Sequence, residues 1–385
     1  MKLHFNRSME NGASPEICIA ANSTWYVYNF RSRLVSTLLA HGYRVSFLAP
    51  HDQWVEKMVA LGARHIELSI NSSGTNALSE GLTLARVFRL LQQQRPSILL
   101  TYTPKINIYC SLAARALGIP VIANISGLGY VFGRENSLTK LVRKLFRVAL
   151  KTPRKVFFQN QEDLDLFLSL GIVQPERSER LPGSGVDVDR FRPRPKHHPT
   201  DRFVFLLVAR LLWEKGVGEY VQAARRLRKV LPNTECRIVG RAGLSNPSSI
   251  PLSQVRDWSH EGVITYLGAS EQIIEQYAEA DCVVLPSYYR EGVPRTLLEA
   301  SSMAVPIITT DMPGCRDALE DGASGLLVRA RDADDLFEKM HAMALLPRCE
   351  RAKMGAAGRK RMTEQFNENL VLDRYLSEIA VALSN

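Results

Sequence analysis

Short apolar or β-branched runs alternate with helical patterns along this chain, in two successive series. Six runs fall in the first half, at residues 17–21, 44–49, 65–68, 98–101, 121–125 and 156–159. Six more follow in the second half, at residues 203–208, 236–239, 264–267, 282–285, 306–309 and 325–328. Strands that alternate with helices form parallel sheets, because parallel neighbours need a crossover connection. The sequence therefore predicts an α/β protein built from two Rossmann-like domains.

A proline-rich segment separates the two series. Residues 189–200, DRFRPRPKHHPT, contain three prolines and no apolar periodicity, which indicates a linker. We therefore expect domains at 1–195 and 196–365, with a final helix at about 366–382 that packs back onto the first domain. Because open parallel sheets bind ligands at the carboxyl ends of their strands, we expect the functional site in a cleft between two facing domains.

Composition excludes several classes of protein. Apolar stretches such as 203–209 are far shorter than the ~20 residues that cross a bilayer. Residues 1–16 contain no apolar run after their basic residues, which argues against a signal peptide and for a cytoplasmic protein. The six cysteines are scattered without a CxxC pair, so we expect buried, reduced thiols and no metal site. A net charge of +10 favours anionic partners without choosing among nucleic acid, phosphorylated metabolites and acidic lipid.

The first motif that carries chemistry is LLVARLLWEKGVGEYV. A strand ends near Arg210, and a helix begins near Lys215 and Gly216. The exposed N–H groups and the positive dipole end of such a helix attract an anion. Arg210 offers a planar guanidinium to phosphate oxygens, and Lys215 adds a second positive charge. The motif indicates a phosphate site, and an ordinary turn with two solvated basic residues is an equally weighted alternative.

The second motif, SYYREGVPRTLLEAS, directly follows an apolar strand. Glu291 occupies the loop, and Glu299 lies eight residues later in the predicted helix. Carboxylates accept hydrogen bonds from sugar hydroxyls, so one suits a hexose and the other a ribose. Gly292 allows the backbone to approach a ligand closely. Either glutamate alone fits a solvated side chain better, but the pair together with the two upstream cations favours a binding site.

On these motifs the chain resembles glycosyltransferase family 4, the retaining nucleotide-sugar glycosyltransferases of the GT-B fold, over nearly its whole length. The resemblance implies that Arg210 and Lys215 bind the donor diphosphate. It implies that Glu291 contacts the donor hexose near the reacting centre and that Glu299 holds the ribose. We therefore expect Glu291, Arg210 and Lys215 to be catalytic. Further donor contacts are expected from Glu299, Gly292, Val293, Pro294, Arg295, Tyr266 and Gly268.

The N-terminal half resembles a narrower subgroup, through NSTWYVYNFR, TYTPKINIY and ISGLGYVFG. Such proteins extend polyprenyl-diphosphate-linked sugars in bacterial surface polysaccharide and glycan assembly. The acceptor-binding residues expected in these segments are Tyr28, Asn29, Arg31, Lys105 and Ser126. Many family members carry a double glycine after the first strand and a histidine near the position of Ser126. This chain has neither, so another group must position the hexose.

The segment SLTKLVRKLFRVALKTPRK predicts a basic amphipathic helix that ends before Pro153. At 100° per residue, an arc of about 100° holds Lys140, Arg143, Lys144, Arg147 and Lys151. The opposite side is predicted to hold Leu141, Val142, Leu145, Phe146, Val148, Ala149 and Leu150. One interpretation is a surface helix whose basic face is solvated. The other is a contact with an anionic membrane surface.

The sequence thus predicts a retaining hexosyltransferase that moves a sugar, with an N-acetylhexosamine on UDP as the best fit to the subgroup, to a polyprenyl-diphosphate-linked acceptor. No metal or other cofactor is expected, because two protein cations face the charge of the leaving group. Two other classes stay open. A nucleotide-sugar epimerase on a similar fold would need no acceptor, and a nucleic-acid-binding protein would rest on net charge alone.

Overall fold

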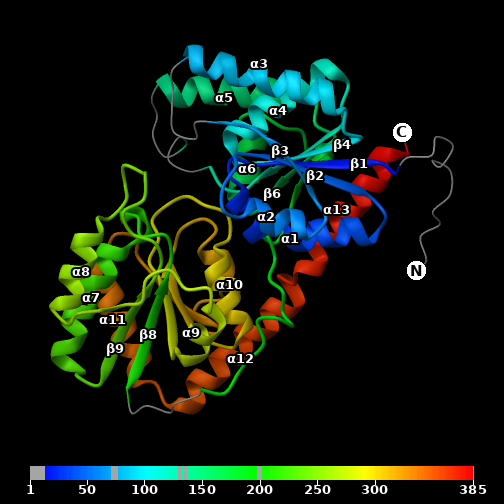
Figure 1. Ribbon diagram of the computed structural model, residues 1–385. Coiled ribbons are helices and arrows are strands. Elements are labelled where there is room, and N and C mark those ends of the chain that lie inside the picture. Colours follow the sequence, from blue (N-terminus) through cyan, green and yellow to red (C-terminus); the bar gives the residue numbers. More distant parts are fainter. Residues whose placement is uncertain (1–13, 71–76, 129–131, 133–136, 197–201, 385) are drawn as a thin grey trace. The chain divides into compact units, whose positions relative to one another are not determined.

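The computed structural model describes residues 14–384 apart from 71–76, 129–131, 133–136 and 197–201. The chain divides into two units, one formed by Met1–Leu181 with Val371–Asn385 and the other by Pro182–Leu370 (Figure 1). The first unit ends before the predicted boundary at 195/196, and the last part of the chain belongs to this unit rather than to the second.

The first unit is built on a seven-stranded parallel sheet in the order β3-β2-β1-β4-β5-β6-β7. Its strands are β1 (Glu16–Ala20), β2 (Arg44–Ala49), β3 (Arg64–Glu67), β4 (Ile98–Tyr102), β5 (Val121–Ile125), β6 (Lys155–Phe158) and β7 (Ser178–Arg180). Its helices are α1 (Thr24–Ala40), α2 (Val55–Ala60), α3 (Ala77–Gln94), α4 (Pro104–Leu117), α5 (Ser137–Ala149), α6 (Gln161–Ser169) and α13 (Glu368–Leu383), with a 3₁₀ turn η2 (Pro175–Arg177).

Helices cover both faces of this sheet (Figure 1). Apolar side chains of α3, α4, α5 and α6 pack on one face, around buried residues such as Phe146 and Phe167. Side chains of α1, α2 and α13 pack on the other face, where Tyr375 of α13 is fully buried. The strands are consequently apolar on both sides, which explains why they appear as continuous apolar runs in the sequence.

The second unit has a six-stranded parallel sheet in the order β10-β9-β8-β11-β12-β13. Its strands are β8 (Phe203–Val208), β9 (Thr234–Val239), β10 (Thr265–Tyr266), β11 (Cys282–Leu285), β12 (Ile307–Thr310) and β13 (Gly325–Val328). Its helices are α7 (Val217–Val230), α8 (Leu252–His260), α9 (Ile273–Glu279), α10 (Arg295–Ser302), α11 (Ala333–Leu345) and α12 (Arg348–Gln365), with 3₁₀ turns η3 (Trp213–Lys215) and η4 (Arg316–Ala318). One face packs against α7, α8 and α11, and the other against α9, α10 and part of α12.

The predicted α/β class with two Rossmann-like sheets is confirmed. Each predicted strand corresponds to an observed strand, with ends that differ by up to two residues. The sequence missed β7, because its three residues SER carry no apolar pattern. This strand is instead held by charge, since Glu179 accepts two hydrogen bonds of 2.7 Å from Arg374 and pairs with Lys155 at 2.9 Å.

The predicted linker at 189–200 needs correction over its first part. Phe191 is only 1% exposed and belongs to the core of the second unit. Its carbonyl oxygen accepts hydrogen bonds from Ser302 at 2.7 Å and from Arg359 at 3.1 Å. A single aromatic residue among prolines was too weak a signal for a packed segment. Residues 197–200 of the predicted linker lie outside the described part of the chain.

All six cysteines are free thiols. Five of them are buried, as predicted, whereas Cys349 is exposed, so the prediction of burial is wrong for this residue. Within the described residues, no helix is both long and apolar enough to cross a membrane. The segment 1–13, which contains most of the stretch inspected for a signal peptide, lies outside the described residues.

Candidate functional site

The predicted donor residues gather at the carboxyl edge of the second sheet. Strands β8 and β11 are neighbours in register, with Phe205 opposite Cys282. Because the two strands are parallel, the segments that follow them leave the sheet at the same edge. Arg210 and Lys215 follow β8, and Glu291 follows β11. The fold therefore places both motifs on one side of one sheet.

Lys215 and Glu291 form a close ion pair in this structure. The Lys215 Nζ atom lies 2.6 Å from both carboxylate oxygens of Glu291. The two side chains are only 10% and 19% exposed, so water screens their attraction weakly. The structure thus joins two of the three residues that were predicted to be catalytic.

A glycine brings the lysine into this position. Gly216 has a φ of 74°, and a Cβ atom added there would lie 2.1 Å from the carbonyl oxygen of Pro286. The loop after β8 therefore presses directly on the loop after β11, which only glycine permits. The backbone N–H of Tyr288 donates to the carbonyl oxygen of Glu214 at 3.0 Å and ties the same two loops together.

Arg210 stands apart from that ion pair. It is exposed, directly beyond the end of β8. Among the residues that the structure describes, it forms no ion pair. The adjacent backbone is fixed by Gly240, where an added Cβ atom would lie 1.7 Å from the carbonyl oxygen of Ala209. The guanidinium is therefore accessible to an external anion, on a backbone that has little room to move.

Glu299 has a separate set of partners. Its carboxylate accepts hydrogen bonds of 3.0 Å from the Nε atom of Arg295 and from the hydroxyl of Tyr277. Burial raises the pKa of Glu299 above its ordinary value, against the attraction of Arg295. Burial and the same carboxylate raise the pKa of Tyr277. The structure therefore places Glu299 in the middle of α10, in a polar cluster with Arg295 and Tyr277.

The other predicted donor residues lie along the same edge of the sheet. Gly292, Val293 and Pro294 are buried and lead into α10. The Tyr266 hydroxyl donates to the carbonyl oxygen of Gly240 at 2.9 Å. The backbone N–H of Gly240 donates to the carbonyl oxygen of Gly268 at 2.8 Å, which links the ends of β9 and β10.

Two residues of this site escaped the sequence analysis. Ser287 is completely buried, and its hydroxyl donates to Oε1 of Glu291 at 2.9 Å. Gly314 has a φ of 83°, and an added Cβ atom would lie 2.4 Å from the carbonyl oxygens of Glu291 and Gly292. Both residues stand in short segments that follow strands. A serine or a glycine shortly after a strand could have pointed to these two positions. Serine and glycine are common in any loop, so this pattern alone does not single them out.

Arg31 is the most deeply buried of the acceptor residues that were predicted in the first unit. Arg31, which was expected to face a ligand, is 2% exposed, with its guanidinium carbon 4.2 Å from the Tyr102 ring centre. Its Nη2 atom donates to the Tyr26 hydroxyl at 3.2 Å. Arg31 was predicted to bind the acceptor, but in this structure its charge is enclosed by tyrosines on the sheet face that α1 covers.

Three other acceptor candidates are held by local contacts. The Tyr28 ring stacks on Trp54 with 4.7 Å between ring centres. The Asn29 side chain donates to the carbonyl oxygen of Trp25 within α1 at 2.9 Å. Lys105 pairs with Glu80 at 2.7 Å. Ser126 is half-buried in the loop after β5, and Tyr130, Val131 and Gly133 of the same motif lie outside the described residues.

The basic helix α5 differs from its prediction on the apolar side. Leu141 and Val148 were expected to pack on the sheet, but they are 53% and 50% exposed. They adjoin the exposed cations Lys140, Lys144, Arg147 and Lys151. Arg143 is half-buried, with its guanidinium carbon 5.8 Å from the Phe132 ring centre. The exposed face is thus mixed basic and apolar, while Phe146 and Ala149 anchor the helix to the core.

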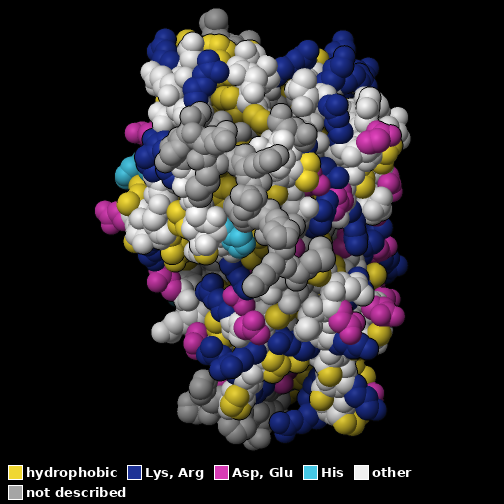
Figure 2. Space-filling model, turned by 90° about the vertical axis from the view of Figure 1, so that its right-hand side faces the viewer, with side chains coloured by type: hydrophobic (Ala, Val, Ile, Leu, Met, Phe, Trp, Pro, Cys, Tyr) yellow, Lys and Arg dark blue, Asp and Glu magenta, His cyan; other side chains and the backbone are white. Residues whose placement is uncertain are grey.

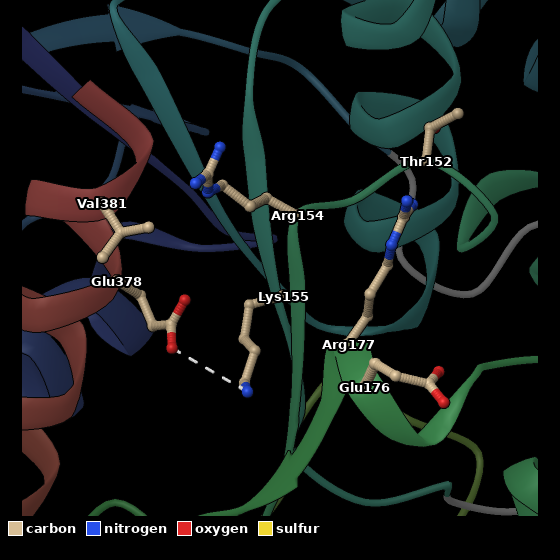
Figure 3. Close-up of a pocket in the computed structure, with 7 residues that line it drawn as sticks. All are labelled: Thr152, Arg154, Lys155, Glu176, Arg177, Glu378 and Val381. Atoms are coloured by element: carbon tan, nitrogen blue, oxygen red, sulfur yellow. Dashed lines mark ion pairs between the residues drawn. The ribbon is translucent and has the colours of Figure 1, made fainter. Parts of the chain in front are cut away.

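A cavity of about 510 Å³ lies close to the end of this helix (Figure 3). Its walls are formed by Thr152, Arg154, Lys155, Glu176, Arg177, Glu378 and Val381. Lys155 points toward Glu378, at 3.8 Å. Because Lys155 begins β6, the cavity lies at the amino end of that strand rather than at the carboxyl edge where parallel sheets bind ligands.

The surface charge is mixed. On the face drawn in Figure 2, groups of Lys and Arg side chains alternate with Asp and Glu side chains. Among the described residues, no group of three or more His, Cys, Asp or Glu side chains is placed to hold a metal ion.

Two family models match the two halves of the chain. One, described as glycosyl transferases group 1, matches residues 189–361, and the other, described as glycosyl transferase 4-like, matches residues 16–160. Their boundary falls near the division between the two units. Each half of the chain therefore has its own match.

Relatives and solved structures agree with these matches. An N,N'-diacetylbacillosaminyl-diphospho-undecaprenol alpha-1,3-N-acetylgalactosaminyltransferase of Campylobacter jejuni is 26% identical, over 91% of this chain and 94% of the relative. A glycosyltransferase structure from Rickettsia africae has a TM-score of 0.77 at 19% identity and covers 97% of this chain and 99% of its own. The structure of Anabaena HepE, in complex with UDP and glucose, has a TM-score of 0.73 at 15% identity and covers 96% and 100%.

Proposed function

Since the chain belongs to glycosyltransferase family 4, whose members are retaining hexosyltransferases, we propose that it transfers an N-acetylhexosamine from a UDP-sugar to a sugar on a polyprenyl diphosphate. The name of the Campylobacter relative supports both the N-acetylhexosamine and the undecaprenyl-diphosphate acceptor. The UDP and glucose bound to HepE support the nucleotide. The observation that carries the proposal is the meeting of Lys215 and Glu291 at the carboxyl edge of one sheet, the edge at which Arg210 also follows a strand.

In this proposal Arg210 and Lys215 stabilise the departing nucleoside diphosphate. Negative charge grows on the diphosphate as the sugar–phosphate bond breaks, and fixed cations lower the energy of that state. The nearby 3₁₀ turn η3 and the start of α7 present further N–H groups to the same region. The two protein cations supply the positive charge, so the proposal needs no metal ion.

The remaining donor contacts follow the order of groups along a UDP-sugar. Glu291 accepts a hydrogen bond from a hexose hydroxyl, and backbone groups from Gly292 to Arg295 contact the hexose or phosphates. Glu299 accepts from the ribose hydroxyls, and the segment from Tyr266 to Gly268 lies beside the base. As in the family it belongs to, the acceptor hydroxyl attacks from the leaving-group side, and a donor phosphate oxygen takes its proton. No protein nucleophile is required.

The acceptor is proposed to bind at the carboxyl edge of the first sheet. The aromatic pair Tyr28 and Trp54 offers ring faces to a sugar, because pyranose C–H groups pack well on aromatic rings. Lys105 and Ser126 supply polar contacts at the ends of β4 and β5. In this proposal Arg31 does not touch the acceptor. It holds the tyrosines around it in place.

A peripheral contact of α5 with the inner face of the cytoplasmic membrane is part of the proposal. Exposed Leu141 and Val148 enter the interface while the neighbouring cations meet anionic headgroups. Each basic residue near such a surface adds ~1 kcal/mol of attraction. Arg154 and Arg177 of the cavity at the end of α5 continue the basic surface. The contact would hold the enzyme where a lipid-linked acceptor is found.

Vesicle sedimentation tests the membrane contact. A variant with Lys140→Glu, Lys144→Glu and Arg147→Glu should bind anionic vesicles much less, and Leu141→Ser with Val148→Ser should reduce binding at high salt. Arg256→Glu in α8 of the second unit is the control for altered net charge. An undiminished bound fraction in both helix variants would favour a helix whose basic face is simply solvated.

A transfer assay tests the reaction itself. The protein is incubated with a labelled UDP-N-acetylhexosamine and a short-chain polyprenyl-diphosphate-linked sugar, and the new linkage is read by NMR. We expect a product that retains the anomeric configuration of the donor. With donor alone, we expect no new sugar nucleotide, whereas an epimerase would form one. Absence of transfer to any lipid-linked sugar would contradict the proposed acceptor class.

A further inference from the structure

The ion pair between Lys215 and Glu291 occupies two of the side chains that the proposed reaction assigns to the donor. With both Lys215 Nζ–Oε distances at 2.6 Å, each charge is satisfied by the other. The pair is largely shielded from solvent, so a ligand that takes one partner must compete with a strong attraction. The ion pair is therefore a competitor of the donor, formed by the site itself.

The two partners are not equally free to move. The Glu291 carboxylate is held independently of the lysine, because Ser287 donates to its Oε1 at 2.9 Å. Ser287 is itself anchored, since the Thr310 hydroxyl donates to its carbonyl oxygen. Gly314 also packs against the Glu291 carbonyl oxygen. The carboxylate therefore stays in place when the lysine leaves.

Lys215 is fixed at its backbone, while its ammonium group hydrogen-bonds to Glu291 and to no other group among the described residues. Gly216 and the carbonyl oxygen of Pro286 hold the turn, as described above. Beyond Cβ, the lysine is a flexible chain of methylene groups that ends in a point charge. Its Nζ lies 5.9 Å from the Tyr289 ring centre, on the side of the loop that follows β11. The ammonium group is thus the mobile partner of the pair.

We propose that this ion pair is a switch that promotes release of the nucleoside diphosphate product, an inference that rests on the proposed function. When the complete donor binds, the diphosphate takes Lys215 and a hexose hydroxyl occupies Glu291. After transfer the hexose has gone, so the carboxylate is again open to the lysine. Re-formation of the ion pair then draws Lys215 from the diphosphate. Ser287 acts as a positioning residue, because it keeps the carboxylate ready for both partners.

The variant Glu291→Gln tests the switch by calorimetry with UDP and with a UDP-sugar. The amide keeps the shape of the side chain but removes the charge that competes for Lys215. We expect UDP to bind about tenfold more tightly or better, because coupling between close, shielded charges is at least of that size. The UDP-sugar should gain less affinity, since its hexose loses a charged hydrogen-bond acceptor in the same variant.

Ser287→Ala provides a second, independent measurement. Without the hydroxyl, the carboxylate loses the hydrogen bond that holds it independently of the lysine, and it is poorly placed for the hexose. We expect a lower kcat with a smaller change in the KM for donor, and UDP affinity within about twofold of the unmodified protein. A merely structural role would instead lower the thermal midpoint and leave the kcat of the folded fraction unchanged.

A double-mutant cycle and a matched control complete the experiment. In a Lys215→Met background, Glu291→Gln should no longer tighten UDP binding. The ammonium group for which the carboxylate and the diphosphate compete is then missing. Glu261→Gln removes a carboxylate that pairs with Arg225 at 2.8 Å on the surface of the same unit, and it should leave UDP affinity unchanged.

The outcomes separate the switch from the proposed function. Equal or weaker UDP binding by Glu291→Gln, while UDP binds the unmodified protein and Arg210→Ala weakens it, would overturn the switch and leave the function standing. A gain that persists in the Lys215→Met background would also overturn it. No UDP binding by the unmodified protein would contradict the proposed function, and the switch would fall with it.

Discussion

The carboxyl edges of the two sheets differ in the surroundings of their arginines, while each edge holds a lysine paired with a glutamate. At the second sheet, Arg210 is exposed and Lys215 is paired with Glu291, the carboxylate that we propose contacts the donor hexose. At the first sheet, Arg31 is enclosed by tyrosines, and Lys105 is paired with Glu80 on a neighbouring helix. Two sheets of the same class thus carry different sites, because function resides in the loops at strand ends rather than in the fold.

The surroundings of a cation determine whether its positive charge is available to a ligand. A cation paired with a group that itself binds ligand returns to that partner when the ligand leaves. A cation enclosed by aromatic rings is stabilised permanently and gives shape rather than binding energy. We therefore expect the second edge to govern turnover and the first to govern acceptor selection.

The largest expected effect on activity comes from replacing Lys215, and Lys105 is the paired lysine of the first unit with which it is compared. Lys215→Met should lower kcat by about 10²–10³-fold, the usual loss when one group that stabilises developing negative charge is removed. Lys105→Met should act chiefly on the KM for acceptor, and by less. Steady-state kinetics with each substrate varied in turn measure both. A Lys215 variant with normal turnover would erase the contrast between the two edges, and Arg225→Met in α7 controls for loss of a surface charge.

The stability losses caused by replacing one glycine in each unit extend the comparison between the two units. Gly216→Ala places a Cβ atom 2.1 Å from a carbonyl oxygen at a φ of 74°, and we expect a loss of about 2–4 kcal/mol. Gly118, at the end of α4 in the first unit, has a φ of 69° with nothing within 4 Å of an added Cβ atom. Gly118→Ala should therefore cost only about 1 kcal/mol. Calorimetric unfolding compares the two, and equal losses would show that the contact between the loops after β8 and β11 is not tight.

A smaller effect concerns two glutamates whose pKa values shift in opposite directions. Burial raises the pKa of Glu299, whereas hydrogen bonds from Lys105 and Tyr109 outweigh burial and lower the pKa of Glu80. In the proposed donor complex the ribose hydroxyls donate to the Glu299 carboxylate, so affinity for a UDP-sugar should fall as the pH is lowered and this carboxylate becomes protonated. The loss begins above the ordinary range of a glutamate because the folded-state pKa is raised.

Matched variants test that assignment. Glu299→Ala should weaken the donor by about 1.5–3 kcal/mol and remove this part of the pH dependence. Glu80→Gln should leave donor affinity and its pH profile unchanged. Unchanged donor affinity in the Glu299 variant would contradict the ribose contact.

The sequence predicted the sheets more completely than the sites. The strands are buried on both faces, so their apolar runs were visible, and the two donor motifs stand close to strand ends. Contacts that depend on distant segments were not visible in this way. The hydrogen bond from Ser287 to Glu291 depends on the conformation of the loop after β11. Phe191 is buried because residues of α10 and α12 contact it. Leu141 and Val148 sit at the edge of a helical face, where periodicity alone does not decide burial.

The central claim is that Arg210 and Lys215 bind the diphosphate of the donor at the carboxyl edge of the second sheet. Titration of UDP into the unmodified protein and into Arg210→Ala, followed by calorimetry, tests it most directly. We predict measurable binding by the unmodified protein and an affinity about 10- to 100-fold weaker in the variant, the usual loss of a hydrogen bond to a charged group. Equal affinity in the two proteins would contradict the account.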